Sequence, residues 1–352
     1  MRIKLICRIS YLKLFRLKSI LFCVMIFSLS NISAQDINFE HLGIQNGLSQ
    51  LTVNSIYQDQ FGMMWFGTRE GINRYDGYKI TSFNPKSGEN TLPGNIINSI
   101  TGDLTGNIYF VCDGKLVDFE QKTEKFSTLN VDNVLSICKS NNGSAIWVLA
   151  TDRLYQLLPD KGLIVYCKLN KDPALKLVFE TSEGSLLIGT KNGLYHLEGK
   201  ETLIPIISQI NVASIYEDRK KNLWISTLGN GFYKLNKKYE ITKNYRHASE
   251  NKYSLSSDDV RCICEDKNGT IWVGTFTGLN KYIENVDGFQ CFSQNISQPG
   301  SILHSSVLPV FCDAQGTIWV GTYYGGVNYF NPDVNIFNYY YPIPNNLSLI
   351  HI

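Results

Sequence analysis

The chain repeats a ten-residue stretch with almost no change. The stretch "GTIWVGTFTG" runs from Gly269 to Gly278, and "GTIWVGTYYG" runs from Gly316 to Gly325. The two copies start 47 residues apart and differ only in the pair of residues before the last glycine. A period of this length indicates a repeat protein, in which each repeat forms one small structural unit.

Five weaker copies of the stretch lie earlier in the chain. The clearest begin at Asp59 ("DQFGMMWFGTREGINRY") and at Asp218 ("DRKKNLWISTLGNGFYKL"), and the seven copies are spaced 37 to 48 residues apart. Their aligned large residues are Trp65, Tyr109, Trp147, Leu187, Trp224, Trp272 and Trp319. We expect these side chains to be buried between repeats, because burial of an aromatic side chain is strongly stabilising.

Each copy divides into short strands joined by turns. In the copy around Trp272 the strands are "VRCICED" (260–266), "TIWVGT" (270–275), "GLNKYI" (278–283) and "FQCFSQ" (289–294). Asn-Gly and Gln-Gly pairs between strands suit turns that need a positive φ. We therefore predict an all-β fold with few helices, a seven-bladed β-propeller of four-stranded antiparallel blades.

Two segments could supply the last strand that closes the ring. They are "INFEHL" (37–42) and "NIFNYYY" (335–341), and each precedes a polar stretch that ends in Leu-Ser. Only one of them is needed for seven blades. The sequence leaves both alternatives open.

The first 34 residues have the pattern of a secretory signal peptide. Six basic residues precede a short apolar run from Ile20 to Leu29, and the small residue Ala34 follows before the expected cleavage point. The run is too short to span a bilayer, which takes about 20 residues, although an uncleaved anchor is the alternative. We expect a signal peptide at 1–34, the propeller at 35–346 and a truncated end of chain at 347–352.

The charge balance argues against a nucleic-acid partner. The whole chain has 33 basic and 31 acidic residues, and removing the six basic residues of 1–34 leaves 27 against 31, a net charge of −4. No basic stripe remains for nucleic acid. Two of the nine cysteines lie in 1–34, and the remaining seven, an odd number in an exported chain, argue against a complete disulfide framework.

No motif in the sequence indicates catalysis, a metal or a cofactor. HExxH, GxSxG, phosphate-loop and dinucleotide motifs are absent. Cys262 and Cys264 share one face of a strand, but Cys264 aligns with an apolar position of the other repeats and Cys262 with a small one, so we interpret both as packing residues. The aspartates at the turns align with one another, and we interpret each as an Asx-type turn that bonds its own backbone. These aspartates are Asp59, Asp103, Asp218, Asp266 and Asp313.

The repeat "D-x-x-G-x-(I/M)-W-x-G-T-x-x-G-(apolar)-N-x-Y" resembles the two-component regulator propeller repeat. The chain is similar to the N-terminal periplasmic part of hybrid two-component sensors of Bacteroidota, with the best copies at Asp59–Tyr75, Asp266–Tyr282 and Asp313–Phe330. The resemblance implies an exported periplasmic sensor that forms homodimers, responds to oligosaccharides and regulates genes for polysaccharide use. It also implies a membrane helix, histidine kinase, receiver and DNA-binding domain further downstream, and so a chain without enzyme activity of its own.

The pair of residues that varies between repeats marks a candidate recognition surface. It occupies the turn between the second and third strands, which in a propeller lies on the face of the connections between blades. Aromatic side chains can cover the C–H faces of sugars, while polar side chains bond their hydroxyl groups. The predicted ligand-binding residues are Arg69, Glu70, Lys191, Asn192, Phe276, Tyr323 and Tyr324.

Three other interpretations stay open at this stage. The variable residues can be ordinary solvated turn residues. The propeller can mediate only structural or protein–protein contacts, or it can be a glycan lyase or hydrolase, for which the active residues would have to converge in space.

Overall fold

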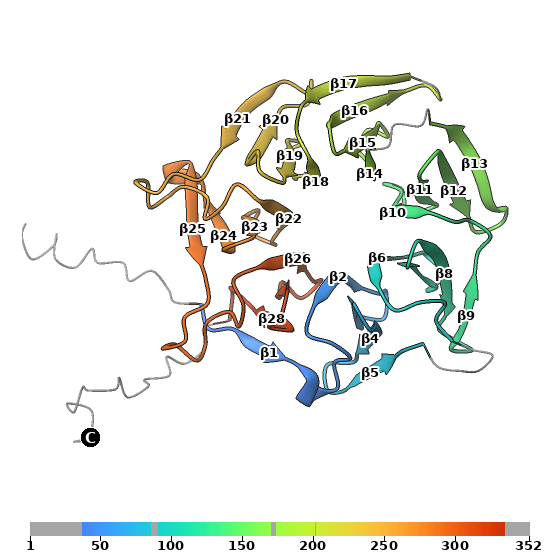
Figure 1. Cartoon of the computed structure of the whole chain (residues 1–352), viewed down its shortest axis with the longest axis horizontal. Coiled ribbons are helices and arrows are strands. Elements are labelled where there is room, and N and C mark those ends of the chain that lie inside the picture. The colour runs from blue at the N-terminus through green and yellow to red at the C-terminus, as the bar shows by residue number, and fades with distance from the viewer. Residues whose placement is uncertain (1–36, 86–90, 170–173, 201, 335–352) are drawn as a thin grey trace, which may run out of the picture. The chain divides into compact units, whose positions relative to one another are not determined.

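The computed structural model describes residues 37–85, 91–169, 174–200 and 202–334. This part of the chain is all-β, with seven four-stranded antiparallel sheets and two short 3₁₀ helices, η1 (Ile44–Asn46) and η2 (Glu284–Val286). Figure 1 shows the seven sheets as the blades of a propeller, as the sequence predicts. The predicted signal peptide (1–34) and the chain end (347–352) lie outside the described residues. Within the described ranges, no helix is long and apolar enough to cross a membrane.

The blades follow chain order, and we number them from one to seven. Blades one and two contain β2 (Val53–Gln58), β3 (Met64–Thr68), β4 (Gly71–Tyr75) and β5 (Ile80–Phe83), then β6 (Ile97–Gly102), β7 (Ile108–Cys112), β8 (Lys115–Glu120) and β9 (Lys125–Thr128). Blades three and four contain β10 (Val134–Lys139), β11 (Ile146–Ala150), β12 (Arg153–Leu158) and β13 (Gly162–Lys168), then β14 (Leu175–Glu180), β15 (Leu186–Thr190), β16 (Gly193–Glu198) and β17 (Thr202–Ser208).

The clearest copies of the repeat lie in blade one and in the last three blades. Blades five and six contain β18 (Val212–Glu217), β19 (Leu223–Thr227), β20 (Phe232–Leu235) and β21 (Ile241–Tyr245), then β22 (Val260–Glu265), β23 (Ile271–Thr275), β24 (Gly278–Ile283) and β25 (Gly288–Phe292). Blade seven contains β26 (Val307–Cys312), β27 (Ile318–Thr322), β28 (Val327–Phe330) and β1 (Glu40–Leu42). The first strand of each blade contacts the first strand of the next, so these strands form the inner ring (Figure 1).

The N-terminal candidate strand closes the ring. Strand β1, from the "INFEHL" segment, pairs antiparallel with β28, so the first and last parts of the propeller share blade seven. Tyr329 donates a hydrogen bond to Glu40 at 2.6 Å beside this pairing. The competing segment "NIFNYYY" lies outside the described residues. Sharing a blade protects the open edge that the last sheet would otherwise present.

The recurrent tryptophans are buried, as predicted. Trp65, Trp224 and Trp272 have almost no exposed surface. Trp65 packs with Ile97 and Phe119 of blade two, so its ring lies in the seam between two blades. The apolar surface that a single blade cannot cover is therefore buried by its neighbour.

The two cysteines of β22 occupy the packing positions predicted for them. Cys264 lies opposite Trp272 in the pairing of β22 with β23, and Cys262 lies opposite Gly274. A Cβ atom on Gly274 would come within 2.3 Å of the Cys262 sulfur, so this position needs small residues on both strands. Both thiols are free and buried.

The turn aspartates bond their own backbone, which confirms the Asx-turn interpretation. Oδ1 of Asp266 accepts hydrogen bonds from the backbone N–H groups of Asn268 and Thr270, both at 2.9 Å. Gly269 in the same turn has a φ of +81°, in the left-handed region that favours glycine. The sequence did not reveal the other contact of this carboxylate, since Oδ2 accepts the indole N–H of Trp272 at 2.9 Å. The same pairing occurs between Asp59 and Trp65, Asp218 and Trp224, and Asp313 and Trp319.

Candidate functional site

The variable turns lie beside the connections between blades, as the sequence analysis predicts. The backbone N–H of Phe276 donates to the carbonyl of Asp259, at 3.0 Å, just before blade six begins. The N–H of Tyr323 makes the same contact with Ser306, at 3.0 Å, just before blade seven. The second-to-third strand turns and the incoming connections therefore form one continuous rim, and we call this face of the propeller the rim face.

A buried threonine fixes the backbone of these turns in five of the seven blades. The hydroxyl of Thr275 donates to the carbonyl of Gly278 at 3.0 Å and accepts the N–H of Thr277 at 3.2 Å. Five blades end their second strand in such a threonine, and these residues are Thr68, Thr190, Thr227, Thr275 and Thr322. The "GT" of the repeat thus holds the turn while the two residues after it vary.

The rim residues of blades seven and one form a cluster of rings around a guanidinium group. The rings of Tyr323 and Tyr324 meet edge to face with centroids 4.3 Å apart. The guanidinium carbon of Arg69 lies 5.0 Å from the Tyr323 ring centre, and the His304 ring lies 6.1 Å from that of Tyr324. Hydrogen bonding to Tyr324, followed by the charge of Arg69, lowers the pKa of Tyr323 below its ordinary value.

Blade six extends this cluster. The guanidinium carbon of Arg261 lies 5.1 Å from the Phe276 ring centre, and its Nη1 donates to the hydroxyl of Ser306 at 2.7 Å. Burial lowers the pKa of Arg261 from its ordinary value, and the charge of Asp259 opposes this effect. We call Arg69, Arg261, Phe276, His304, Tyr323 and Tyr324 the rim cluster.

Part of the rim cluster was not found from the sequence. Arg261 and His304 lie outside the variable pairs, on the inner strand β22 and in the connection between β25 and β26. Only the ring arrangement brings them next to Phe276 and Tyr324. Of these two residues, only Arg261 has a signal in the sequence, because it is a long cationic residue at the second position of an inner strand.

Three predicted residues lie on the rim face but do not extend the cluster of rings. Lys191 and Asn192 occupy the β15–β16 turn of blade four, three blades away from blade seven along the ring. Burial and then the charge of Lys191 lower the pKa of the neighbouring Lys176. Glu70 follows Arg69, with its backbone N–H bound to Thr68 at 3.0 Å and its side chain exposed.

The aromatic side chains of the rim cluster reach solvent. Phe276 is 52% exposed and Tyr324 is 55% exposed. Large exposed rings beside guanidinium groups can stack on a flat ligand face and donate hydrogen bonds at its edge. Among the described residues, no group of three or more His, Cys, Asp or Glu side chains could hold a metal ion.

Comparison with known proteins confirms the repeat. Residues 47–70, 206–229 and 254–277 match the family model described as "Two component regulator propeller". These segments fall in blades one, five and six. A 71-residue stretch is 44% identical to Histidine kinase P4 of Formosa agariphila, covering 18% of this chain and 5% of the kinase.

Solved structures share the fold. The extracellular domain of the hybrid two component system BT3049 from B. thetaiotaomicron has a TM-score of 0.68 and 24% identity, over 84% of this chain and 42% of that one. Virginiamycin B lyase from Staphylococcus aureus has a TM-score of 0.66 and 15% identity, over 84% of this chain and 99% of the lyase. At these identities the likeness establishes the propeller fold and leaves activity open. The chain spans less than half the length of the BT3049 domain.

Proposed function

We propose that this chain is the ligand-sensing propeller of an extracytoplasmic two-component receptor, and that its rim cluster binds an oligosaccharide. The regulator propeller repeats and the likeness to extracellular domains of two-component systems support the first part. The observation that carries the second part is the group of exposed rings and guanidinium groups on the rim face, where threonine hydroxyls fix the turns between the second and third strands. The described residues form a propeller and include no kinase domain.

The chemistry of the rim cluster suits a sugar. The exposed faces of Phe276 and Tyr324 can cover the C–H surface of a pyranose ring. Arg69 and Arg261 each offer several N–H donors, and within the described residues neither forms an ion pair. Stacking on Tyr323 and Phe276 already orients both guanidinium groups, so the arginine side chains lose less conformational entropy when a ligand binds.

Signalling requires that the ligand distinguish two states of the receptor. In the proposed receptor the propeller is exported, acts as part of a homodimer in the periplasm and is followed by a membrane-anchored kinase. A ligand that binds both states equally would shift nothing, so the rim cluster must change its contacts with neighbouring modules between the two states. The output would be regulation of genes for polysaccharide use.

The first test is a thermal-melt screen of the chain against plant, host and microbial oligosaccharides. One sugar class should raise the melting temperature, since a ligand at about 100 times its Kd adds about 2.7 kcal/mol. The Tyr323→Ala/Tyr324→Ala variant should lower that affinity at least about tenfold. Tyr78→Ala is the matched control, because Tyr78 is 96% exposed but lies on the opposite face, in the β4–β5 turn. Unchanged affinity in the double variant would remove the rim cluster from the proposal.

A further inference from the structure

A pocket of about 390 Å³ lies between blades five and six. Its lining includes Lys220 from the β18–β19 turn, Lys234 from β20, Lys281 from β24 and Gln290 from β25. The lining also includes Glu284 from the β24–β25 connection. The β18–β19 turn joins a first to a second strand and the β24–β25 connection joins a third to a fourth, so the pocket opens on the face opposite the rim cluster. It is therefore separate from the site of the proposed function.

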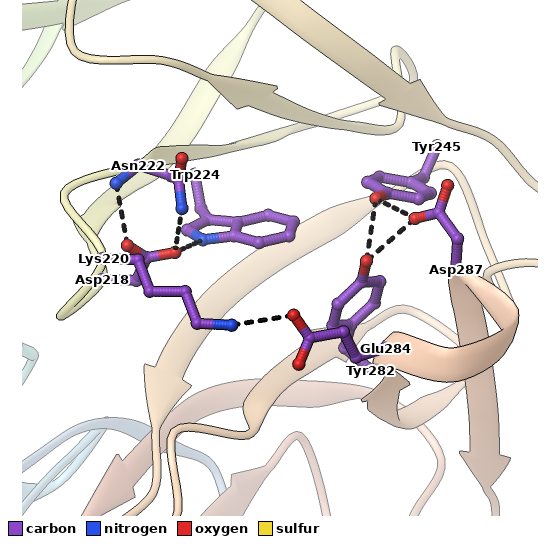
Figure 2. Close-up of polar contacts among 8 residues, drawn as sticks. All are labelled: Asp218, Lys220, Asn222, Trp224, Tyr245, Tyr282, Glu284 and Asp287. Atoms are coloured by element: carbon purple, nitrogen blue, oxygen red, sulfur yellow. Dashed lines mark hydrogen bonds and ion pairs between the residues drawn. The ribbon is translucent and has the colours of Figure 1, made fainter.

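The acidic groups of the pocket are already occupied by partners within the protein. Asp218 accepts the indole N–H of Trp224 at 2.8 Å (Figure 2). Lys220, in the same turn as Asp218, reaches across the seam to Glu284 of blade six, at 2.7 Å (Figure 2). The third carboxylate, Glu265, accepts the backbone N–H of Arg219 at 3.0 Å. The carboxylates of the lining are thus engaged with donors of the protein itself.

Two ammonium groups of the pocket lack such acceptors. Lys234 lies over Trp224, with its nitrogen 4.8 Å from the ring centre, and Lys281 lies over Trp272 at 5.5 Å. Neither ammonium group forms a hydrogen bond or ion pair with another side chain in the described ranges. An aromatic face positions a cation but offers no oxygen to its N–H groups. The pocket therefore presents donors and needs acceptors.

The seam between blades one and two shows how the same position is satisfied elsewhere. Arg74 on β4 corresponds to Lys234 on β20, since each lies opposite the tryptophan of its blade. Arg74 lies 5.8 Å from the Trp65 ring centre and forms an ion pair with Glu124 of the next blade at 2.9 Å. In the seam of blades five and six, the carboxylate in the corresponding turn is Glu284, and Lys220 binds it. Lys234 forms no ion pair with Glu284, although its charge, after the hydrogen bond and charge of Lys220, helps to lower the pKa of that carboxyl, and its ammonium group lines the pocket.

We propose that this pocket binds the oxyanion group, a carboxylate or a sulfate, of a small acidic sugar. Lys234 and Lys281 donate charge-assisted hydrogen bonds to the oxyanion. The side-chain amide of Gln290, which has no hydrogen-bond partner among the described residues, bonds an adjacent hydroxyl group. The volume lies at the lower end for small-molecule sites, which suits one sugar ring.

The test uses thermal melts and titration calorimetry of the chain at matched ionic strength. The probes are sodium glucuronate, glucose 6-sulfate, sodium sulfate and glucose. We expect glucuronate or glucose 6-sulfate, but not glucose, to raise the melting temperature and bind. A response to glucuronate alone assigns the group to carboxylates, and a response to glucose 6-sulfate or sulfate alone assigns it to sulfates.

Substitutions locate the site. Lys234→Gln and Lys281→Gln should each weaken binding at least about tenfold, while Lys234→Arg, which keeps the charge, should retain most of it. Arg74→Gln is the matched control in the seam between blades one and two and should leave binding unchanged. Tyr323→Ala/Tyr324→Ala, on the other face, should also leave it unchanged. The proposal is overturned if no anion exceeds sodium chloride, or if Arg74→Gln weakens binding as much as Lys234→Gln.

Discussion

Blades six and four place different residues at the same two positions. In blade six, the buried carboxylate of Asp266 holds both its turn and the indole of Trp272. In blade four, the turn residue is Thr181, which accepts one backbone N–H from Ser185 at 3.1 Å, and the strand residue is Leu187. Both residues have changed together. A buried indole N–H needs an acceptor, so tryptophan and carboxylate occur as a pair.

Blade three shows that the acceptor need not be local. Its turn residue is Ser140, which has no carboxylate to accept the indole N–H of Trp147. The indole N–H of Trp147 donates instead to Glu180 of blade four, at 2.9 Å. The buried indole N–H group needs an acceptor, and in the closed ring of blades a neighbouring blade can provide it.

Replacing Trp272 with leucine, the residue of blade four, should have the largest effect on stability. The variant loses a large buried ring and leaves Oδ2 of Asp266 buried without its donor. We expect a loss of about 3 kcal/mol or more in the free energy of unfolding, measured by urea titration. The Asp266→Thr/Trp272→Leu double variant copies blade four and should lose at least about 1 kcal/mol less than the sum of the two single changes. Additive losses would show that the pair is not coupled.

The carboxylate by itself should matter less than the ring. Asp266→Asn keeps the shape but turns an N–H group toward the indole N–H, which we expect to cost about 2 kcal/mol. The matched change in blade four is Thr181→Val, which removes a single hydrogen bond and should cost about 1 kcal/mol. Equal losses in urea titration would show that the carboxylate does no more than the hydroxyl.

The third strands of the two blades also differ. Blade six has the buried Asn280, which accepts the backbone N–H of Ser256 at 3.0 Å and thereby pins the connection that enters the blade, whereas blade four has Tyr195. Asn280→Ala should cost about 1–2 kcal/mol and speed amide hydrogen exchange at Ser256. Unchanged exchange at Ser256 would show that the connection is held by other contacts.

The smallest effect should come from the charged network at the outer edge of blade six. Lys243, and then Tyr245, lower the pKa of Asp287 to about 2 (Figure 2 shows the contacts with Tyr245 and Tyr282). The folded pKa lies below the unfolded value of about 3.9, so this contribution is fully present above about pH 5 and is lost as the pH falls toward 2. The side chain is 46% exposed, and solvent screening keeps the effect small. The urea midpoints of wild type and Asp287→Asn should differ at pH 6 and converge near pH 2, and a constant gap would contradict this.

Most of the fold could be predicted from local patterns. The strands predicted around Trp272 coincide with β22 to β25 to within a few residues, and β24 matches at both ends. Short apolar runs and glycine turns are properties of a few consecutive residues, so a single repeat displays them. The aspartate turns were also predictable, since Asp266 bonds residues two and four places later. Their second partner, the indole, was missed because nothing in the spacing shows that the side chain of Trp272 turns back.

The candidate site was predictable only in part. The variable pairs place Arg69, Phe276, Tyr323 and Tyr324 on one face, and the structure brings Arg69 and the two tyrosines together. No feature of the repeat separates these residues from Lys191, which occupies the same position in a distant blade.

The amino-acid sequence was enough to predict the number of blades, the strands within each blade and the buried tryptophans, because these follow from short-range periodicity repeated seven times. The closed ring is needed to place β1 as the last strand, to bring Arg261 and His304 into the rim cluster and to leave Lys234 without an ion-pair partner among the residues that the structure describes. Each of these depends on which side chains of different blades meet. That is set by the register and curvature of the closed ring, which no single repeat encodes.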